Sequence, residues 1–105
     1  MGLIKGVLRE ELENSLRMKD DYERGLAKLP KGSLVKKTIK GHEYYYLLLR
    51  EEGKVKFIYK GKVSEQEIKK YQEAKKHRAN YRKLLSQVKK QVRFLRSALR
   101  GKESV

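Results

Sequence analysis

The positions of proline and glycine constrain this chain more than any other feature of its sequence. The one proline and a series of glycines fall at short intervals in the middle of the chain, at Pro30, Gly32, Gly41, Gly53 and Gly61. No further glycine occurs until Gly101. Both residue types favour turns and interrupt regular elements. The 105 residues therefore divide into an N-terminal segment, a middle segment cut by turns and a long C-terminal segment, which we expect to form a single domain over residues 1–105.

Both outer segments have the apolar spacing of a helix. In the first, apolar residues recur three, four or six positions apart, at Leu8, Leu12, Leu16, Tyr22, Leu26 and Leu29. This spacing predicts a helix over about residues 5–28, which Pro30 ends. The last segment opens with Ser64 and has Glu67 three residues later, which is the pattern of a capping box. It predicts a long helix over about residues 64–100.

The long helix also carries the seam of a coiled coil. Its apolar residues alternate steps of four and three, at Tyr81, Leu85, Val88, Val92, Leu95 and Leu99. We expect the first helix to pair with this seam in an antiparallel hairpin. The part of the long helix that outruns the first leaves apolar residues that a second copy could cover, which would give a homodimer through the long helix.

The middle segment is rich in β-branched and aromatic residues. Turns at Lys40-Gly41 and at Glu51-Glu52-Gly53 separate three strands, which we expect near residues 33–39, 42–50 and 54–60. They form a β-meander over about residues 33–60. The fold predicted for the chain is therefore α+β: an antiparallel, coiled-coil-like helical hairpin with a three-stranded antiparallel β-meander between its two helices.

Charge is distributed unevenly over these segments. The chain has 28 Lys and Arg against 13 Asp and Glu, a formal net charge of +15. The first helix mixes both signs, whereas residues 74–102 contain no acidic residue. Residues of such a stretch cannot form stabilising i,i+4 ion pairs with one another. We therefore expect an anionic partner to bind its cations. The candidate contacts on this helix are Lys75, Lys76, Arg78, Arg82, Lys83, Lys89, Lys90, Arg93 and Arg96.

The sheet carries a second basic surface. If the turns close as expected, one face is apolar, with Leu34, Tyr45, Leu47, Leu49, Val55, Phe57 and Tyr59, and covers the start of the long helix around Ile68 and Tyr71. The opposite face then has cations between tyrosines, and its candidate contacts are Lys37, Tyr44, Tyr46, Arg50, Lys54, Lys56 and Lys60. The alternative is that Tyr44, Tyr46 and Leu48 pack against the first helix, because a shift of one residue in register exchanges the two faces.

Cations and tyrosines on one surface are suited to nucleic acid. Lys and Arg contact phosphates, while tyrosine rings can stack on unpaired bases or donate a hydroxyl to the backbone. A narrow sheet can also enter the major groove of DNA. We therefore expect a non-catalytic nucleic-acid-binding protein, with DNA favoured over RNA as its partner. Binding through phosphates would be salt-sensitive and largely independent of base sequence.

Residues 29–65 resemble known families. The stretch from Leu29 to Leu47, with Pro30-Lys31-Gly32 and Tyr44-Tyr45-Tyr46, followed by Gly53–Lys62, resembles an uncharacterised family of small basic prokaryotic proteins. Its pattern is also similar to the arm-type DNA-binding domains of tyrosine recombinases and to the N-terminal hairpins of some transposases. That second resemblance implies that cations of the second and third strands read DNA and that the protein acts in a phage or mobile element. The chain departs from the recombinase pattern in its much longer last helix.

Other classes of function have little support in the sequence. The two histidines, His42 and His77, lie far apart, there is no Cys, and no acidic residue stands at the spacing of a catalytic relay. We expect no enzyme, no metal and no cofactor. The alternative function is a protein-interaction module, or an inhibitor that docks on an acidic surface or on an enzyme that handles nucleic acid. Without Cys or a membrane-length apolar stretch, we expect a cytoplasmic protein, at the nucleoid if its partner is DNA.

Overall fold

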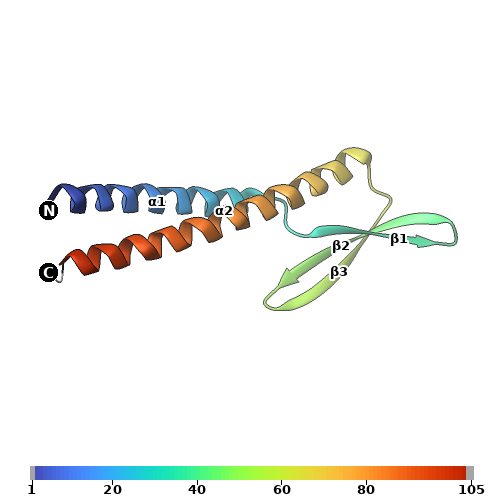
Figure 1. Cartoon of the computed structure of the whole chain (residues 1–105). Helices are drawn as coiled ribbons and strands as arrows, with labels where there is room; N and C mark the ends of the chain where they lie inside the picture. Colours follow the sequence, from blue (N-terminus) through green and yellow to red (C-terminus); the bar gives the residue numbers. More distant parts are fainter. Residues whose placement is uncertain (1, 104–105) are drawn as a thin grey trace. The chain divides into compact units, whose positions relative to one another are not determined.

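The structure, a computed structural model, describes residues 2–103 and the side chains of residues 3–101. Its elements in chain order are α1 (Gly2–Lys28), β1 (Ser33–Ile39), β2 (His42–Glu51), β3 (Lys54–Gly61) and α2 (Glu65–Glu103) (Figure 1). The three strands form an antiparallel sheet in the order β1-β2-β3. The predicted α+β class and the predicted meander between two helices are confirmed.

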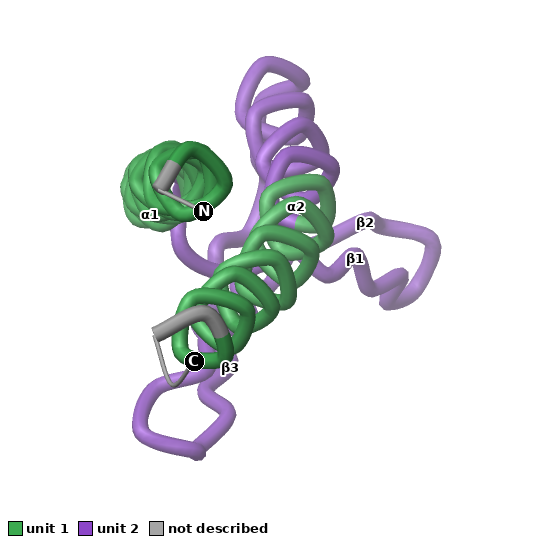
Figure 2. The backbone as a smooth tube through the Cα atoms, turned by 60° about the vertical axis from the view of Figure 1, so that its left-hand side comes forward, with its two compact units in different colours: residues 1–28, 79–105 green, residues 29–78 purple. Residues whose placement is uncertain are grey.

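The chain forms two compact units (Figure 2). The first consists of Met1–Lys28 and Ala79–Val105, which contain α1 and the C-terminal part of α2. The second consists of Leu29–Arg78, which contain the sheet and the first turns of α2. That both units form one domain stays a prediction from the sequence.

The helix ends follow local sequence signals. At the start of α2, the backbone N–H of Glu67 donates a hydrogen bond to Ser64 Oγ at 3.2 Å, as the capping box predicts. Helix α1 ends at Lys28, shortly before Pro30, and it begins at Gly2 rather than near residue 5. Helix α2 continues past the expected end near residue 100 to Glu103. A single glycine costs a helix only about 1 kcal/mol, so Gly101 does not end it.

In the first unit, α1 and the C-terminal part of α2 run antiparallel (Figure 1). Near one end of this hairpin the Tyr22 and Tyr81 rings lie 6.3 Å apart. A methyl group at Gly25 would come within 2.6 Å of the Tyr81 ring, so glycine permits this close approach. The predicted seam of α2 is confirmed by its buried residues, which are Val88, Val92, Leu95 and Leu99.

The seam of α1 includes two polar residues that the apolar pattern missed. Ser15 is the most deeply buried side chain of the described residues, at 1 % exposure, and Lys19 is half-buried. With them, the seam of α1 steps by four and three, through Leu8, Leu12, Ser15, Lys19, Tyr22 and Leu26. This matches the heptad spacing of the α2 seam. No buried side-chain N or O atom among the described residues lacks a hydrogen-bond partner.

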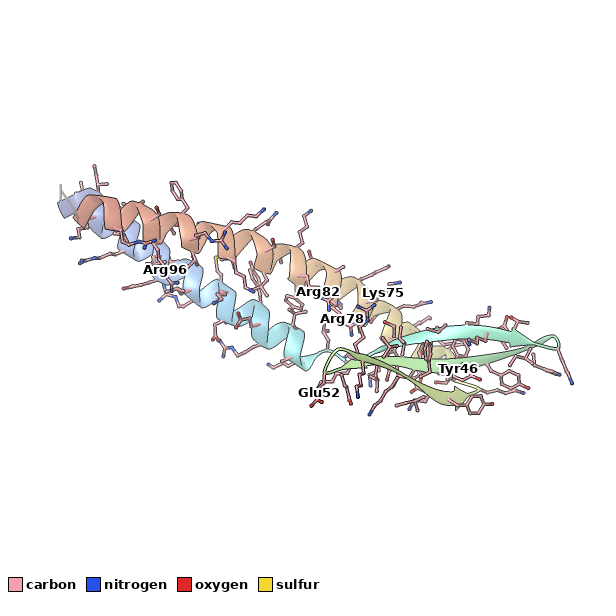
Figure 3. The ribbon with its side chains drawn as sticks, turned by 90° about the horizontal axis from the view of Figure 1, so that it is seen from below. Tyr46, Glu52, Lys75, Arg78, Arg82 and Arg96 are labelled. Atoms are coloured by element: carbon pink, nitrogen blue, oxygen red, sulfur yellow. The ribbon has the colours of Figure 1, made fainter. Side chains whose placement is uncertain are left out.

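In the second unit, both hairpins close through two-residue turns. Lys40 and Gly41 have φ angles of 52° and 80°, and Glu52 and Gly53 have φ angles of 51° and 76°. Positive φ at both central residues is what a type I′ turn requires. The first turn confirms the predicted pairing of β1 with β2, in which Ile39 faces His42. Glu52 marks the tip of the second hairpin (Figure 3).

The predicted register of β3 is wrong by one residue. The three-residue turn Glu51-Glu52-Gly53 would pair Arg50 with Lys54, but Arg50 pairs with Val55 and Glu51 pairs with Lys54. Because successive side chains of a strand point to opposite faces, this shift exchanges residues 54–59 of β3 between the two faces. A β-bulge at Tyr45 and Tyr46 makes Lys60 the extra residue of β3.

The register defines the two faces of the sheet. The aromatic face carries Val35, Lys37, Ile39, His42, Tyr44, Tyr46, Leu48, Arg50, Val55, Phe57 and Tyr59. The helix-side face carries Leu34, Lys36, Thr38, Glu43, Tyr45, Leu47, Leu49, Glu51, Lys54, Lys56 and Ile58. Val55, Phe57 and Tyr59 therefore lie on the aromatic face, and Lys54 and Lys56 lie opposite it, in contrast to the prediction.

The first turns of α2 lie beside the helix-side face. Ile68 and Tyr71 line one hollow together with Leu34 and Tyr45, as the sequence predicts. Leu47 is buried on this face, at 7 % exposure, and Ala74 is buried on α2. The core of the second unit therefore lies on one side of the sheet only. Neither helix, within the residues described, contains an apolar stretch long enough to cross a bilayer.

Candidate functional site

The aromatic face presents a continuous series of rings drawn from two strands. The ring centroids of His42 and Tyr44 lie 6.4 Å apart, and Tyr44 lies 6.3 Å from Tyr59. Tyr59 in turn lies 5.4 Å from Tyr46 in an edge-to-face arrangement. Cross-strand aromatic pairs of this kind stabilise a hairpin, so the rings support one another without a core beneath them.

A lysine lies among these rings. Lys37 Nζ is 5.1 Å from the centre of the Tyr46 ring and 5.8 Å from the centre of the Phe57 ring. At such distances an ammonium group is attracted by the negative faces of the rings. The contact holds the Lys37 cation on the aromatic face, where it can meet an anion.

Large apolar groups on this face remain in contact with water. Phe57 is 58 % exposed and Tyr59 is 60 % exposed, while Tyr44 and Tyr46 are half-buried. A contiguous exposed apolar patch with polar surroundings often marks a binding surface. Arg50 is exposed on the same face, so the patch combines rings with cations.

Carboxylates are confined to the other face and to a turn. Within the strands and turns of residues 33–61, all of which the structure describes, Glu43 and Glu51 lie on the helix-side face and Glu52 lies in the second turn. Glu43 contacts Lys36 Nζ at 2.8 Å, and Glu51 contacts Lys56 Nζ at 3.7 Å. The hydrogen bond and the attraction to Glu43 raise the pKa of Lys36. The aromatic face itself contains no carboxylate.

The predicted contacts of α2 are divided between the two units, and most of them lie in the first. Those of the predicted contacts that are exposed on this helix are Lys75, Lys76, Arg82, Lys83, Lys89, Lys90, Arg93 and Arg96. In the first unit, Arg82, Lys89, Arg93 and Arg96 are spaced by seven, four and three, which puts them on one flank of the seam. Lys83 and Lys90, seven residues apart, lie on the outer side of the helix.

A shallow hollow beside this flank is lined almost wholly by cations. Its lining consists of Lys19, Lys89, Val92, Arg93, Arg96 and Arg100. Lys19 comes from the seam of α1 and lies 3.9 Å from Glu23. The sequence reasoning missed Lys19 because it treated α1 as charge-balanced, although the heptad spacing would have placed this lysine beside α2.

One predicted contact, Arg78, has a structural partner. Its Nη2 donates hydrogen bonds to the carbonyl oxygens of Pro30, at 2.7 Å, and Gly32, at 3.5 Å. The side chain is half-buried and ties α2 to the segment that leads into the sheet (Figure 3). Because this guanidinium is engaged with the backbone, it is less available to a ligand than that of Arg82.

The candidate residues thus form separate groups. Lys37, Tyr44, Tyr46 and Arg50 share the aromatic face, which also gains Phe57 and Tyr59. Lys54 and Lys56 lie on the helix-side face, and Lys60 lies at the bulge. The sequence reasoning missed Phe57 and Tyr59 as candidates because of the register of β3; the two-residue length of its turn would have identified them.

The described residues contain no group of three or more His, Asp or Glu side chains that could hold a metal ion. The chemical groups that the described side chains offer to a ligand are the charged and aromatic groups of the surfaces above. These can bind a ligand through ion pairs and ring contacts.

Comparison with known proteins identifies a family but no function. Residues 8–70 match a family described as "Domain of unknown function (DUF6788)", and the match covers α1 from Leu8 on, the whole sheet and the start of α2. No curated protein and no solved structure matches the chain, so the resemblance to recombinase and transposase domains gains no support. The resemblance to an uncharacterised family agrees with the match. Since the match covers more than half of the chain, the protein belongs to the DUF6788 family.

Proposed function

We propose that this protein binds nucleic acid without catalysing a reaction, and that it binds DNA in preference to RNA. The observation that carries the proposal is the absence of carboxylates from two basic surfaces, the aromatic face and the stretch of α2 over residues 74–102. Outside these surfaces, Lys19, Arg24, Lys36 and Lys56 each contact a carboxylate. A surface that keeps its cations unneutralised favours a polyanionic ligand.

Binding would work by replacing condensed counterions. Each phosphate neutralised by a Lys or Arg releases cations from the nucleic acid, and the gain in entropy drives association. With a net charge of +15, long-range attraction adds to the association rate at low salt. The contacts on α2 would be indifferent to base sequence because they address only the backbone.

The aromatic face could be used in two ways. As a narrow ribbon it could enter the major groove of duplex DNA, where Lys37 and Arg50 would reach base edges. Alternatively, its rings could stack on unpaired bases. Only the first mode discriminates strongly between DNA and RNA, because the major groove of A-form RNA is too narrow to admit side chains. The preference for DNA over RNA itself rests on the similarity in pattern to the arm-type DNA-binding domains of tyrosine recombinases.

The proposal also covers where the protein acts and whether it forms a homodimer. Action in the cytoplasm is proposed from the lack of Cys and of a membrane-length apolar stretch in the sequence, and action at the nucleoid follows if the partner is DNA. An origin in a phage or mobile element rests on the sequence resemblance. A homodimer through α2 would help to cover Phe94, which is 68 % exposed. Light scattering coupled to size exclusion, at several protein concentrations, tests this assembly.

The test of the main proposal is a binding series in salt. Fluorescence anisotropy is measured for labelled single-stranded and duplex DNA and RNA at 50 and 200 mM salt. We expect binding at 50 mM, with DNA bound more tightly, and a loss of about a thousandfold at 200 mM if six phosphates are neutralised. If no polynucleotide binds at 50 mM, the proposal is wrong.

A second candidate function has one specific observation in its favour. The apolar side chains of Val55 and Phe57 are exposed on the aromatic face, and an acidic protein could bury them. In that case the protein would dock on a partner or inhibit an enzyme that handles nucleic acid. Purification with and without nuclease and high salt separates the two: a protein that elutes free of 260 nm absorbance at low salt favours the protein partner.

A further inference from the structure

We infer that the aromatic face binds unpaired nucleotides by stacking their bases on its rings, rather than entering a duplex groove. This inference rests on the proposed function, and it names the form of nucleic acid that the sheet recognises. It depends on Phe57, on the spacing of the tyrosine rings and on the position of Lys37.

Phe57 is the group that duplex binding explains least. Its side chain is 58 % exposed and has no hydrogen-bonding atom. The negative face of its ring repels a phosphate, and a phenyl group cannot read the hydrogen-bonding pattern of base edges. The flat surface of an unpaired base, by contrast, fits such a ring whatever the base. A duplex keeps these surfaces inside its own stack.

The spacing of the rings favours an extended strand. The centroids along the series from His42 through Tyr44 and Tyr59 to Tyr46 are separated by 5.4 to 6.4 Å. Successive bases of a duplex strand rise by only about 3.4 Å, so they could not each meet a separate ring. A strand that is drawn out over the sheet can place one base on each of several rings.

The cations of the face lie where the backbone of such a strand would run. Lys37 Nζ sits within 6 Å of both the Tyr46 and Phe57 rings. A base stacked on either ring would bring its phosphate near this ammonium group. Arg50 lies on the same face, and no carboxylate shares the face to repel a phosphate. This charge complementarity favours an oligonucleotide over an apolar protein segment as the occupant.

The experiment compares two oligomers of equal charge. One is a 15-nucleotide oligo-dT, and the other is a 15-unit abasic deoxyribose phosphate, which keeps every phosphate and lacks every base. Both are titrated into the full chain at 50 mM salt. Binding of both oligomers is followed by the fluorescence anisotropy of a 5′ fluorescein label. Contact with the rings is followed separately by intrinsic tyrosine fluorescence, which is free of tryptophan signal because the chain has seven Tyr and no Trp.

We expect oligo-dT to bind at least about tenfold more tightly than the abasic oligomer, since stacking adds to the phosphate contacts. Only oligo-dT should quench the tyrosine fluorescence. Phe57→Leu keeps the apolar volume but removes the ring, and it should reduce the affinity ratio at least about threefold. Ile58→Leu, the neighbouring change on the helix-side face, should leave the ratio unchanged.

Other results overturn the inference in distinguishable ways. Equal affinity for both oligomers would show that bases are not stacked, while binding of nucleic acid itself would survive. If Phe57→Leu weakened binding of a 15-base-pair duplex as much as binding of oligo-dT, the face would meet duplexes as well, which favours groove entry over stacking. Binding of neither oligomer would defeat the proposed function as well, and binding of oligo-glutamate alone would favour a protein partner. Circular dichroism checks the fold of each variant, and Tyr59→Leu replaces Phe57→Leu if the latter does not fold.

Discussion

Both faces of the sheet carry lysines, but the groups that surround these lysines differ between the faces. On the helix-side face, Lys36 and Lys56 contact Glu43 and Glu51, and the first turns of α2 cover part of the surface. On the aromatic face, Lys37 lies over rings, and no acid is nearby. The difference indicates that the helix-side face serves the fold, whereas the aromatic face keeps its charge for a ligand.

The same contrast separates the two helices. In α1, Arg24 contacts Asp20 and Asp21 at 2.9 and 2.8 Å. Arg17 donates a hydrogen bond to Asn14. In α2, by contrast, residues 74–102 contain no acidic residue. Exposed pairs such as those of α1 contribute little to stability, but they neutralise the surface toward an anion.

The strongest test of the difference between the two faces is to remove two rings of the aromatic face at once. Tyr46→Leu with Tyr59→Leu deletes an edge-to-face pair 5.4 Å apart, and we expect the affinity for oligo-dT to fall about a hundredfold, because each stacked base is typically worth 1–3 kcal/mol. Tyr45→Leu alters the helix-side face instead and should change the affinity less than about twofold. Anisotropy titrations of folded variants measure both. Equal losses from both variants would contradict a division of labour between the faces.

The comparison between helices is sharpened by a matched pair of double variants. Arg93→Gln with Arg96→Gln removes two cations from the carboxylate-free flank of α2. Affinity for DNA should fall about tenfold or more at 50 mM salt, and the slope of log affinity against log salt should decrease by about 1.5.

The control, Arg17→Gln with Arg24→Gln, removes the same formal charge from α1. Arg24 is already paired with Asp20 and Asp21, whereas Arg17 has only the neutral Asn14 as its partner. The slope should therefore fall by no more than about 0.9, the value for one phosphate contact. If both double variants lower the slope equally, net charge alone determines binding, and the distribution of carboxylates has no role.

Arg78 provides a test in which stability, not binding, should change. It was predicted as a ligand contact, but its side chain is hydrogen-bonded to the backbone of the second unit. Arg78→Gln removes the hydrogen bonds to the Pro30 and Gly32 carbonyls. We expect a loss of about 1.5 kcal/mol in the free energy of unfolding, measured by urea titration. Arg82→Gln, one turn further along α2, should leave stability within about 0.5 kcal/mol. An unchanged stability of the Arg78 variant would return this residue to the group of ligand contacts.

The sequence was sufficient to predict the elements, because their signals are local. Pro30, the Ser64 and Glu67 cap, and the Lys40-Gly41 turn each determine an end or a turn through adjacent residues. The α2 seam was also predictable, since its apolar side chains repeat at heptad spacing. Family membership agrees with the resemblance read from the residues between the helices.

Two features were missed because the type of a residue alone does not reveal its place in the fold. Glu51 and Glu52 are equally polar, so the pattern did not show which of them pairs with β3, and this choice assigned Phe57 and Tyr59 to the wrong face. Ser15 and Lys19 occupy seam positions of α1 although neither is apolar. A buried small residue and the stem of a lysine both fit between packed helices, so an apolar count omits them.

The smallest expected effect gives the most closely matched comparison, because Lys36 and Lys37 are adjacent in sequence and lie on opposite faces. Lys37→Gln should weaken oligo-dT binding about fivefold at 50 mM salt and lower the salt slope by about 0.7, the loss of one phosphate contact on a single strand. Lys36→Gln removes the same charge from a lysine whose ammonium already binds Glu43, and it exposes that carboxylate only on the helix-side face. Its affinity should therefore stay within about twofold of the parent. A larger loss from Lys36→Gln than from Lys37→Gln would reverse the assignment of the two faces.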